Sequence, residues 1–138
     1  MRNILKHTFL FLVGGTIYFF LEILFRSYSH PSMFILGGIC FVIIGLLNET
    51  KYFQMPLLLQ MFISSIIITV LELFTGLIVN IWLGLSVWNY SNLPFNLLGQ
   101  VCILYTVIWF FLSLPAILLN DYLRYKFFNK KWVKYKII

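Results

Sequence analysis

Charged residues are scarce in this sequence. Only 10% of its 138 residues are charged, whereas 62% are hydrophobic and 20% are aromatic. A soluble domain carries roughly a quarter charged residues, so this chain has too few to keep a surface hydrated. We therefore expect its surplus apolar surface to face lipid.

Cysteine and histidine are also rare, with two of each. Cys40 and Cys102 fall inside apolar runs, which indicates packing residues rather than a disulfide or a metal site. His7 and His30 fall on opposite sides of the membrane in the topology derived below, and His30 is expected to be an exposed loop residue. The sequence has no glycine-rich phosphate loop and places no base beside a serine. It therefore predicts no metal, no cofactor and no enzymatic activity.

Long apolar runs are what the sequence has in abundance. They are continuous rather than alternating, which favours helices over a transmembrane β-barrel. At about 20 residues per span, the chain has room for four helices. We predict an all-α integral membrane protein, a four-transmembrane-helix bundle in which residues 1–138 form one domain. The predicted spans cover residues 7–25, 32–47, 56–83 and 97–119, and a basic tail covers residues 120–138.

Lysine and arginine gather near the two ends of the chain. Eight of the ten basic residues lie there, so the positive-inside rule predicts that both termini are cytoplasmic, in a bacterial cell membrane. Beside a membrane span, the basic tail is expected to contact anionic lipid headgroups rather than nucleic acid. Trp82, Trp88 and Tyr90 are expected to form an aromatic belt on the outer side.

Two carboxylates fall inside the predicted spans. At ~1.5 Å per residue, Glu22 lies about 22 Å along the first span and Glu72 about 24 Å along the third, which places both in the outer half of the membrane. Arg26 lies one turn beyond Glu22 and can pair with either carboxylate. The predicted outer-half polar cluster comprises Glu22, Arg26, Glu72, Asn80, Asn96 and Gln100. Elsewhere we expect plain apolar packing, helped by small residues such as Gly38 and Gly45.

Two interpretations of this cluster stay open. In the first, the charges form a buried network that neutralises itself and fixes helix register. In the second, they line a site for a substrate or an ion, because ionisable groups inside a membrane indicate function by default.

The second half of the chain resembles the bacterial family labelled "putative ABC-transporter type IV". The matching residues are Glu72, Thr75, Gly76, Trp88, Tyr90, Ser91, Asn96, Gly99, Gln100 and Trp109. In the first half, Glu22, Arg26 and the HPSMFILGG run from His30 to Gly38 also fit, so the resemblance covers nearly the whole chain. One departure lies in the outer-loop motif Trp88-Asn89-Tyr90-Ser91, since Asn89 stands where the family usually has Asp.

The resemblance implies a transporter or permease-like subunit. The sequence has no Walker motif, so any ATPase would be a separate partner. Four helices are few for a permease, so a homo-oligomer or a larger membrane complex is expected. The alternatives are a small oligomeric channel and a structural or interaction subunit.

Overall fold

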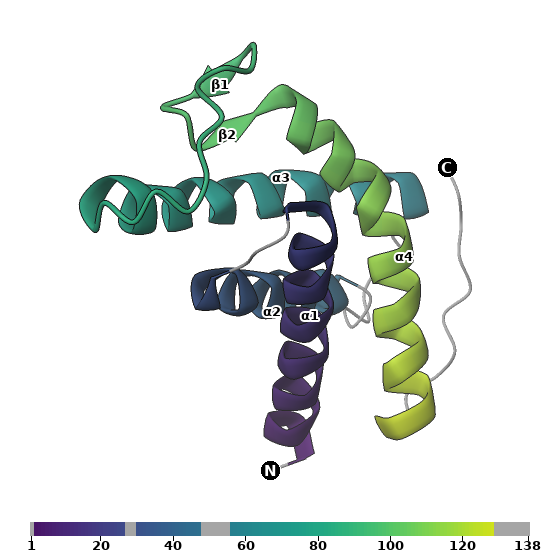
Figure 1. Cartoon of the computed structure of the whole chain (residues 1–138). Coiled ribbons are helices and arrows are strands. Elements are labelled where there is room, and N and C mark those ends of the chain that lie inside the picture. Colours follow the sequence, from purple (N-terminus) through teal and green to yellow (C-terminus); the bar gives the residue numbers. More distant parts are fainter. Residues whose placement is uncertain (1, 27–29, 48–55, 129–138) are drawn as a thin grey trace.

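The computed structural model describes residues 2–26, 30–47 and 56–128, and these residues are mostly helical. The order of elements is α1 (Arg2–Arg26), α2 (Pro31–Leu46), α3 (Leu57–Gly76), the π-helix η1 (Leu77–Trp82), β1 (Asn96–Leu97), β2 (Val101–Cys102) and α4 (Ile103–Phe128). In Figure 1, α3 runs across the view and α4 descends past it.

Three of these helices are long and apolar enough to cross a membrane. The candidate segments are Ile4–Leu24, Leu57–Trp82 and Ile103–Phe128. The segment made by α3 and η1 rises about 39 Å, more than the ~30 Å hydrocarbon core, which favours a tilted span. By contrast, α2 has 16 residues and rises only about 24 Å.

The fourth predicted span begins too early. Its predicted start at residue 97 is wrong, because residues 96–102 form the antiparallel β1–β2 hairpin and α4 begins at Ile103. The helix also continues to Phe128, nine residues beyond the predicted end of the span. The first part of the predicted tail, residues 120–128, is therefore helical. The prediction that the tail binds anionic lipid rests mainly on residues 129–138, which lie outside the described residues.

The start of α2 is set by a side-chain cap. His30 is the N-cap, and its Nδ1 accepts a hydrogen bond from the backbone N–H of Ser32 at 3.1 Å. Pro31 follows at the first helical position, where its missing N–H leaves no helical bond unmade. His30 is thus a half-buried capping residue, not the exposed loop residue that we expected.

Glycines allow α1 and α2 to pack closely. A Cβ added at Gly38 would lie 2.7 Å from the ring of Phe11, and one added at Gly37 would lie 2.5 Å from the Cβ of Tyr18. Neither position can hold a larger residue without displacing α1, as small-residue helix contacts in membranes require. The predicted close approach at Gly38 is confirmed.

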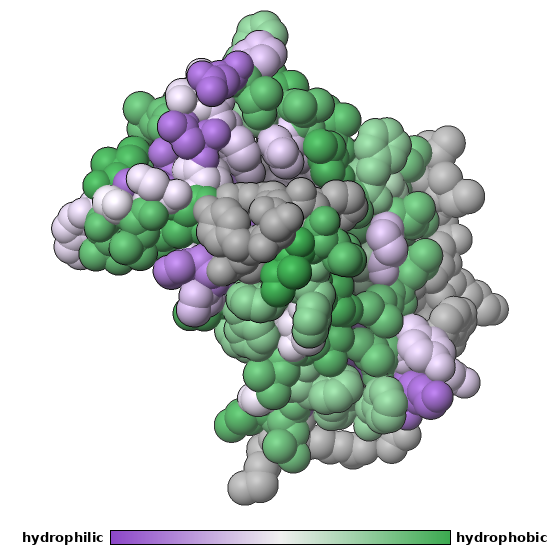
Figure 2. Space-filling view, in the orientation of Figure 1, coloured by the Kyte–Doolittle hydropathy of each residue, from purple (hydrophilic) through white to green (hydrophobic). Residues whose placement is uncertain are grey.

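The outer surface of the helices is apolar. Large hydrophobic side chains are exposed along the helices, for example Leu24 (78%) and Phe111 (65%). Figure 2 shows hydrophobic residues over most of the visible face, while hydrophilic ones lie around the β1–β2 hairpin and in smaller patches, one of them at the lower right near the end of α4. This is the distribution of a protein whose solvent is lipid. Cys40 and Cys102 are free and buried, which confirms that they are packing residues.

Candidate functional site

The carboxylate of Glu72 lies inside the protein near the end of α3. Only 1% of the residue is exposed. The hydroxyl of Tyr90 donates a hydrogen bond to Oε2 of Glu72 at 3.3 Å. Tyr90 is held in turn by the ring of Tyr105 on α4, with the two rings stacked 4.6 Å apart. The loop, α3 and α4 therefore meet at this carboxylate.

Tyr18 connects Glu72 with the second carboxylate. It lies on α1, one turn before Glu22, and its hydroxyl donates a side-chain hydrogen bond to Glu22. Tyr18 also interacts electrostatically with Glu72 and Tyr90. We call Tyr18, Glu22, Glu72 and Tyr90 the carboxylate–tyrosine cluster. The backbone of Arg26 ends α1, but its side chain lies outside the described part of the structure, so its pairing with a carboxylate stays a prediction.

Asn80 and Gln100 lie close to this cluster but hold the loop. Nδ2 of Asn80 donates to Oε1 of Gln100 at 2.8 Å, while Oδ1 of Asn80 accepts from the backbone N–H of Val87 at 2.7 Å. Gly76 makes room for this arrangement, since a Cβ there would lie 2.5 Å from Oε1 of Gln100. Asn80 belongs to η1, and π-helical turns occur often at functional sites.

Asn96 stabilises the hairpin turn between β1 and β2. Its Oδ1 accepts from the backbone N–H of Gly99 at 3.1 Å, and its Nδ2 donates to the carbonyl of Leu93 at 2.8 Å. Leu98 and Gly99 both have positive φ, +56° and +74°, as in a type I′ turn. A positive φ is unfavourable for leucine. Gln100 fixes this residue through a bond from Nε2 to the carbonyl of Leu98 at 2.9 Å.

The outer-loop motif is hydrogen-bonded to the same hairpin. The indole Nε1 of Trp88 donates to the carbonyl of Gln100 at 2.9 Å, and only 4% of Trp88 is exposed. Trp88 is therefore a core residue, and its predicted place in an aromatic belt is wrong. The backbone N–H of Ser91 donates to Oδ1 of Asn89 at 2.9 Å. Asparagine and aspartate both offer this oxygen, so Asn89 forms the same turn that the expected aspartate would form.

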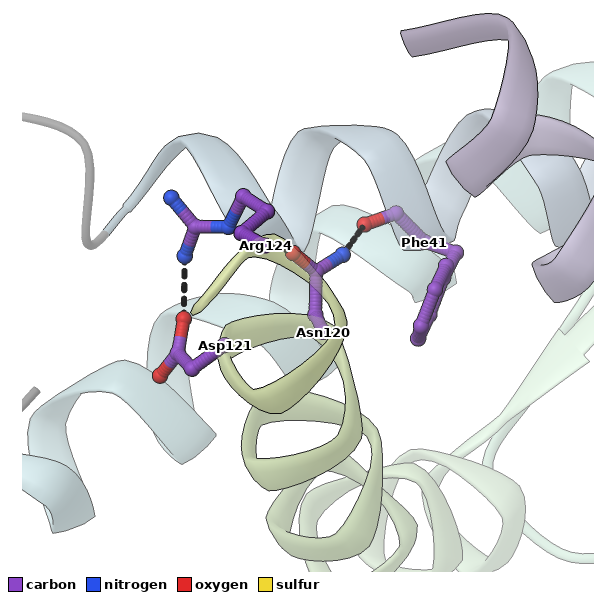
Figure 3. A network of polar contacts seen from close by, with 4 residues as sticks. All are labelled: Phe41, Asn120, Asp121 and Arg124. Carbon is purple, nitrogen blue, oxygen red and sulfur yellow. Dashed lines mark hydrogen bonds and ion pairs between the residues drawn. The ribbon is translucent and has the colours of Figure 1, made fainter. Parts of the chain in front are cut away.

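A second polar cluster lies near the far end of α4. Nδ2 of Asn120 donates to the carbonyl of Phe41 at 2.7 Å, and Nε of Arg124 donates to Oδ1 of Asn120 at 2.9 Å. Arg124 also forms an ion pair with Asp121. Figure 3 shows Asn120 between Arg124 and α2. We call Asn120, Asp121 and Arg124 the α4 ion-pair cluster; all three are at least 96% buried.

This cluster was not predicted, because the predicted fourth span ends at residue 119, just before the polar residues Asn120 and Asp121. The expectation of plain apolar packing outside the outer half is wrong. The signal was present in the spacing, since Arg124 follows Asn120 by four residues and Asp121 by three, so each of the two can contact Arg124 along the helix. Other polar residues buried in the protein are Lys6, Gln60, Ser64, Ser65 and Ser113. Among the described residues, no group of histidine, cysteine, aspartate or glutamate is arranged to hold a metal ion.

Both clusters lie within the part of the chain that a known family covers. The family model described as "Putative ABC-transporter type IV" matches residues 9–137. The chain belongs to this family. The resemblance predicted from the sequence is thereby confirmed, and family membership together with three apolar helices makes this a membrane protein. Searches of curated proteins and of solved structures found no match.

Proposed function

We propose that this chain is a transporter subunit that binds a cationic group at the carboxylate–tyrosine cluster. The observation that carries the proposal is the position of Tyr18, which hydrogen-bonds Glu22 on its own helix and interacts with Glu72 on α3. Tyr18 therefore lies within electrostatic range of carboxylates on two different helices, and one of them, Glu72, is buried and accepts a hydrogen bond from Tyr90. Burying carboxylates within apolar helices is costly, and such groups commonly mark a substrate or ion pathway.

The family supports a place in a membrane complex. We infer that the chain lies in the bacterial cytoplasmic membrane with both termini on the cytoplasmic side, following its basic residues. The sequence has no Walker motif, so a separate ATPase subunit would supply the energy. The chain would act in a homo-oligomer or in a larger complex, and the proposal assigns it no catalysis.

One alternative has support of its own. Asn80, Asn96 and Gln100 were expected to line the site, but their amides bond the loop and each other. This favours a structural role for that side of the predicted cluster. An oligomeric channel has less support, because the cavity between α1, α2 and α4 is lined by apolar side chains rather than by a polar path. Glu22 and Glu72 are thus the residues whose role an experiment must decide.

Carbodiimide labelling tests the proposal without a known substrate. Dicyclohexylcarbodiimide reacts with protonated carboxyl groups inside membranes, and peptide mass spectrometry locates the product. We expect labelling of Glu72 in the full-length protein in proteoliposomes, and we expect Na⁺, K⁺, guanidinium or tetramethylammonium to slow it. Any cation that protects should then show a flux that Glu72→Gln abolishes.

Asp121 is the internal control, because its carboxylate is already paired with Arg124. Its labelling should not respond to the cations. If none of these cations protects Glu72, and proteoliposomes with the Glu72→Gln variant behave as wild type while its melting temperature is unchanged, the cation site does not exist. A lower melting temperature without any protection would favour the structural alternative.

A further inference from the structure

A large cavity lies between α1, α2 and α4, and of the residues in the two clusters only Tyr18 lines it. Its volume is about 340 Å³, within the usual range for ligand pockets of roughly 300–1,000 Å³. The lining is almost entirely apolar and includes Ile17, Leu36, Ile44, Leu112, Ala116 and Leu119. An apolar cavity of even roughly 150 Å³ stays dry and takes up apolar molecules, because water finds no polar partners there.

Two aromatic contacts join α1 to α4, one towards each end of this cavity. Towards one end, the rings of Tyr18 and Trp109 meet edge to face with centroids 5.8 Å apart. Towards the other, Phe9 contacts Phe127 at 5.6 Å. Between these contacts the two helices are separated, and α2 forms the floor through residues such as Leu36.

The cavity is continuous with the surface that faces lipid. Ile17 on α1 and Leu112 on α4 both line it, and they are 40% and 42% exposed. Beside them the apolar surface continues through Phe20 and Phe111, which are 59% and 65% exposed. The entrance therefore lies between two helices that are each long enough to span the membrane. An occupant that enters there comes from the hydrocarbon layer.

We propose that the acyl chain of a bilayer phospholipid inserts between α1 and α4 and fills this cavity. A hydrocarbon chain needs no polar partner, and it is the molecule that the exposed rim already contacts. An inserted acyl chain supplies van der Waals contacts to the lining side chains, which otherwise have no contact atoms on the side of the cavity. This site adjoins the cation site proposed above at Tyr18, but it does not depend on that site.

A photoactivatable phospholipid tests the insertion. The full-length protein is placed in nanodiscs with a phospholipid that carries a diazirine in the middle of one acyl chain, and crosslinks are mapped by mass spectrometry. We expect crosslinks to Leu36 and Ile44 on the cavity floor. These two residues are only 4% and 3% exposed, so the lipid that surrounds the protein does not reach them. Phe111 on the outer surface should crosslink in every sample.

Filling the cavity should remove only the inner crosslinks. Ala116→Phe places an aromatic ring inside the cavity. Leu112→Trp narrows the entrance from its exposed rim, where a larger side chain is tolerated. This second variant keeps the test valid if Ala116→Phe fails to fold. Each should abolish crosslinking at Leu36 and leave that at Phe111 unchanged. The proposal is overturned if wild-type crosslinks are confined to exposed residues, if both variants retain the Leu36 crosslink, or if a second copy of the chain is crosslinked there instead.

Discussion

The side-chain amide of Asn120 on α4 donates a hydrogen bond to the backbone carbonyl of Phe41 on α2, across 2.7 Å. The same amide accepts a bond from Arg124, so one fully buried side chain joins two helices and an ion pair. Backbone carbonyls within a helix already accept one bond, and their second lone pair is open to such a contact. Asn120 is therefore the residue on which the packing of this end of α4 against α2 depends.

Replacing Asn120 by alanine should destabilise the protein. The change removes both bonds and leaves Nε of Arg124 without this acceptor in a buried position. Side-chain hydrogen bonds within membrane proteins contribute about 0.6 kcal/mol on average, and burying a polar group without its partner costs about 1–3 kcal/mol, so a loss of about 1–3 kcal/mol is expected. Thermal unfolding in detergent measures it. Asn92→Ala in the exposed loop is the matched control, and equal melting temperatures for the two variants would contradict the prediction.

Gly45 should be intolerant of alanine for a related reason. A Cβ at this position would overlap Oδ1 of Asn120, so Gly45→Ala must push α4 away from α2. We expect the single variant to unfold at a lower temperature. In the Asn120→Ala background the overlap is gone, and the penalty of Gly45→Ala should shrink. The unfolding free energies of the wild type, the two single variants and the double variant form a double-mutant cycle. If the two single-variant losses of stability simply add up in the double variant, the contact is refuted.

The apolar helices were predictable because lipid imposes a simple rule. A span must be apolar and about 20 residues long, so the helical segments around Glu22 and Glu72 follow from composition and length. The end of α4 was not predictable by the same rule. Asp121 and Arg124 neutralise one another and bond to Asn120, so a helix that hydropathy ends at residue 119 continues beyond it.

The candidate site was predictable only in part. Helical rise placed Glu22 and Glu72 at similar depth, and both interact with Tyr18 in the structure. Tyr18 itself was missed because its ring belongs to an apolar run. Gln100 was expected to line the site, but it fixes Leu98 at a positive φ in a turn. The sequence around Leu98 contains no common type I′ pair such as Asn-Gly, so this turn depends on tertiary contacts.

Removing one charge of the Asp121–Arg124 ion pair should destabilise the protein more than removing both charges. Asp121→Asn removes the negative charge beside a guanidinium that is 96% buried, and breaking a buried pair in this way costs about 3–5 kcal/mol. The double variant Asp121→Asn, Arg124→Gln removes both charges and should be more stable than Asp121→Asn alone. Unfolding in detergent compares them. A double variant that is less stable than the single one would show that the two charges act independently.

Asn80→Ala should loosen the loop that covers the carboxylate–tyrosine cluster. Oδ1 of Asn80 accepts a hydrogen bond from the backbone N–H of Val87 at 2.7 Å and another from that of Trp88 at 3.4 Å. A bond of this kind contributes about 1 kcal/mol, so hydrogen exchange of the Val87 amide should accelerate about fivefold. Hydrogen-exchange mass spectrometry of the peptide that contains Val87 and Trp88 measures the change. Asn92→Ala, at an exposed position in the same loop, should leave that peptide unchanged. If Asn80→Ala has no greater effect than this control, the bonds to Asn80 do not order the loop, and the position of Tyr90 over Glu72 must depend on its stacking against Tyr105.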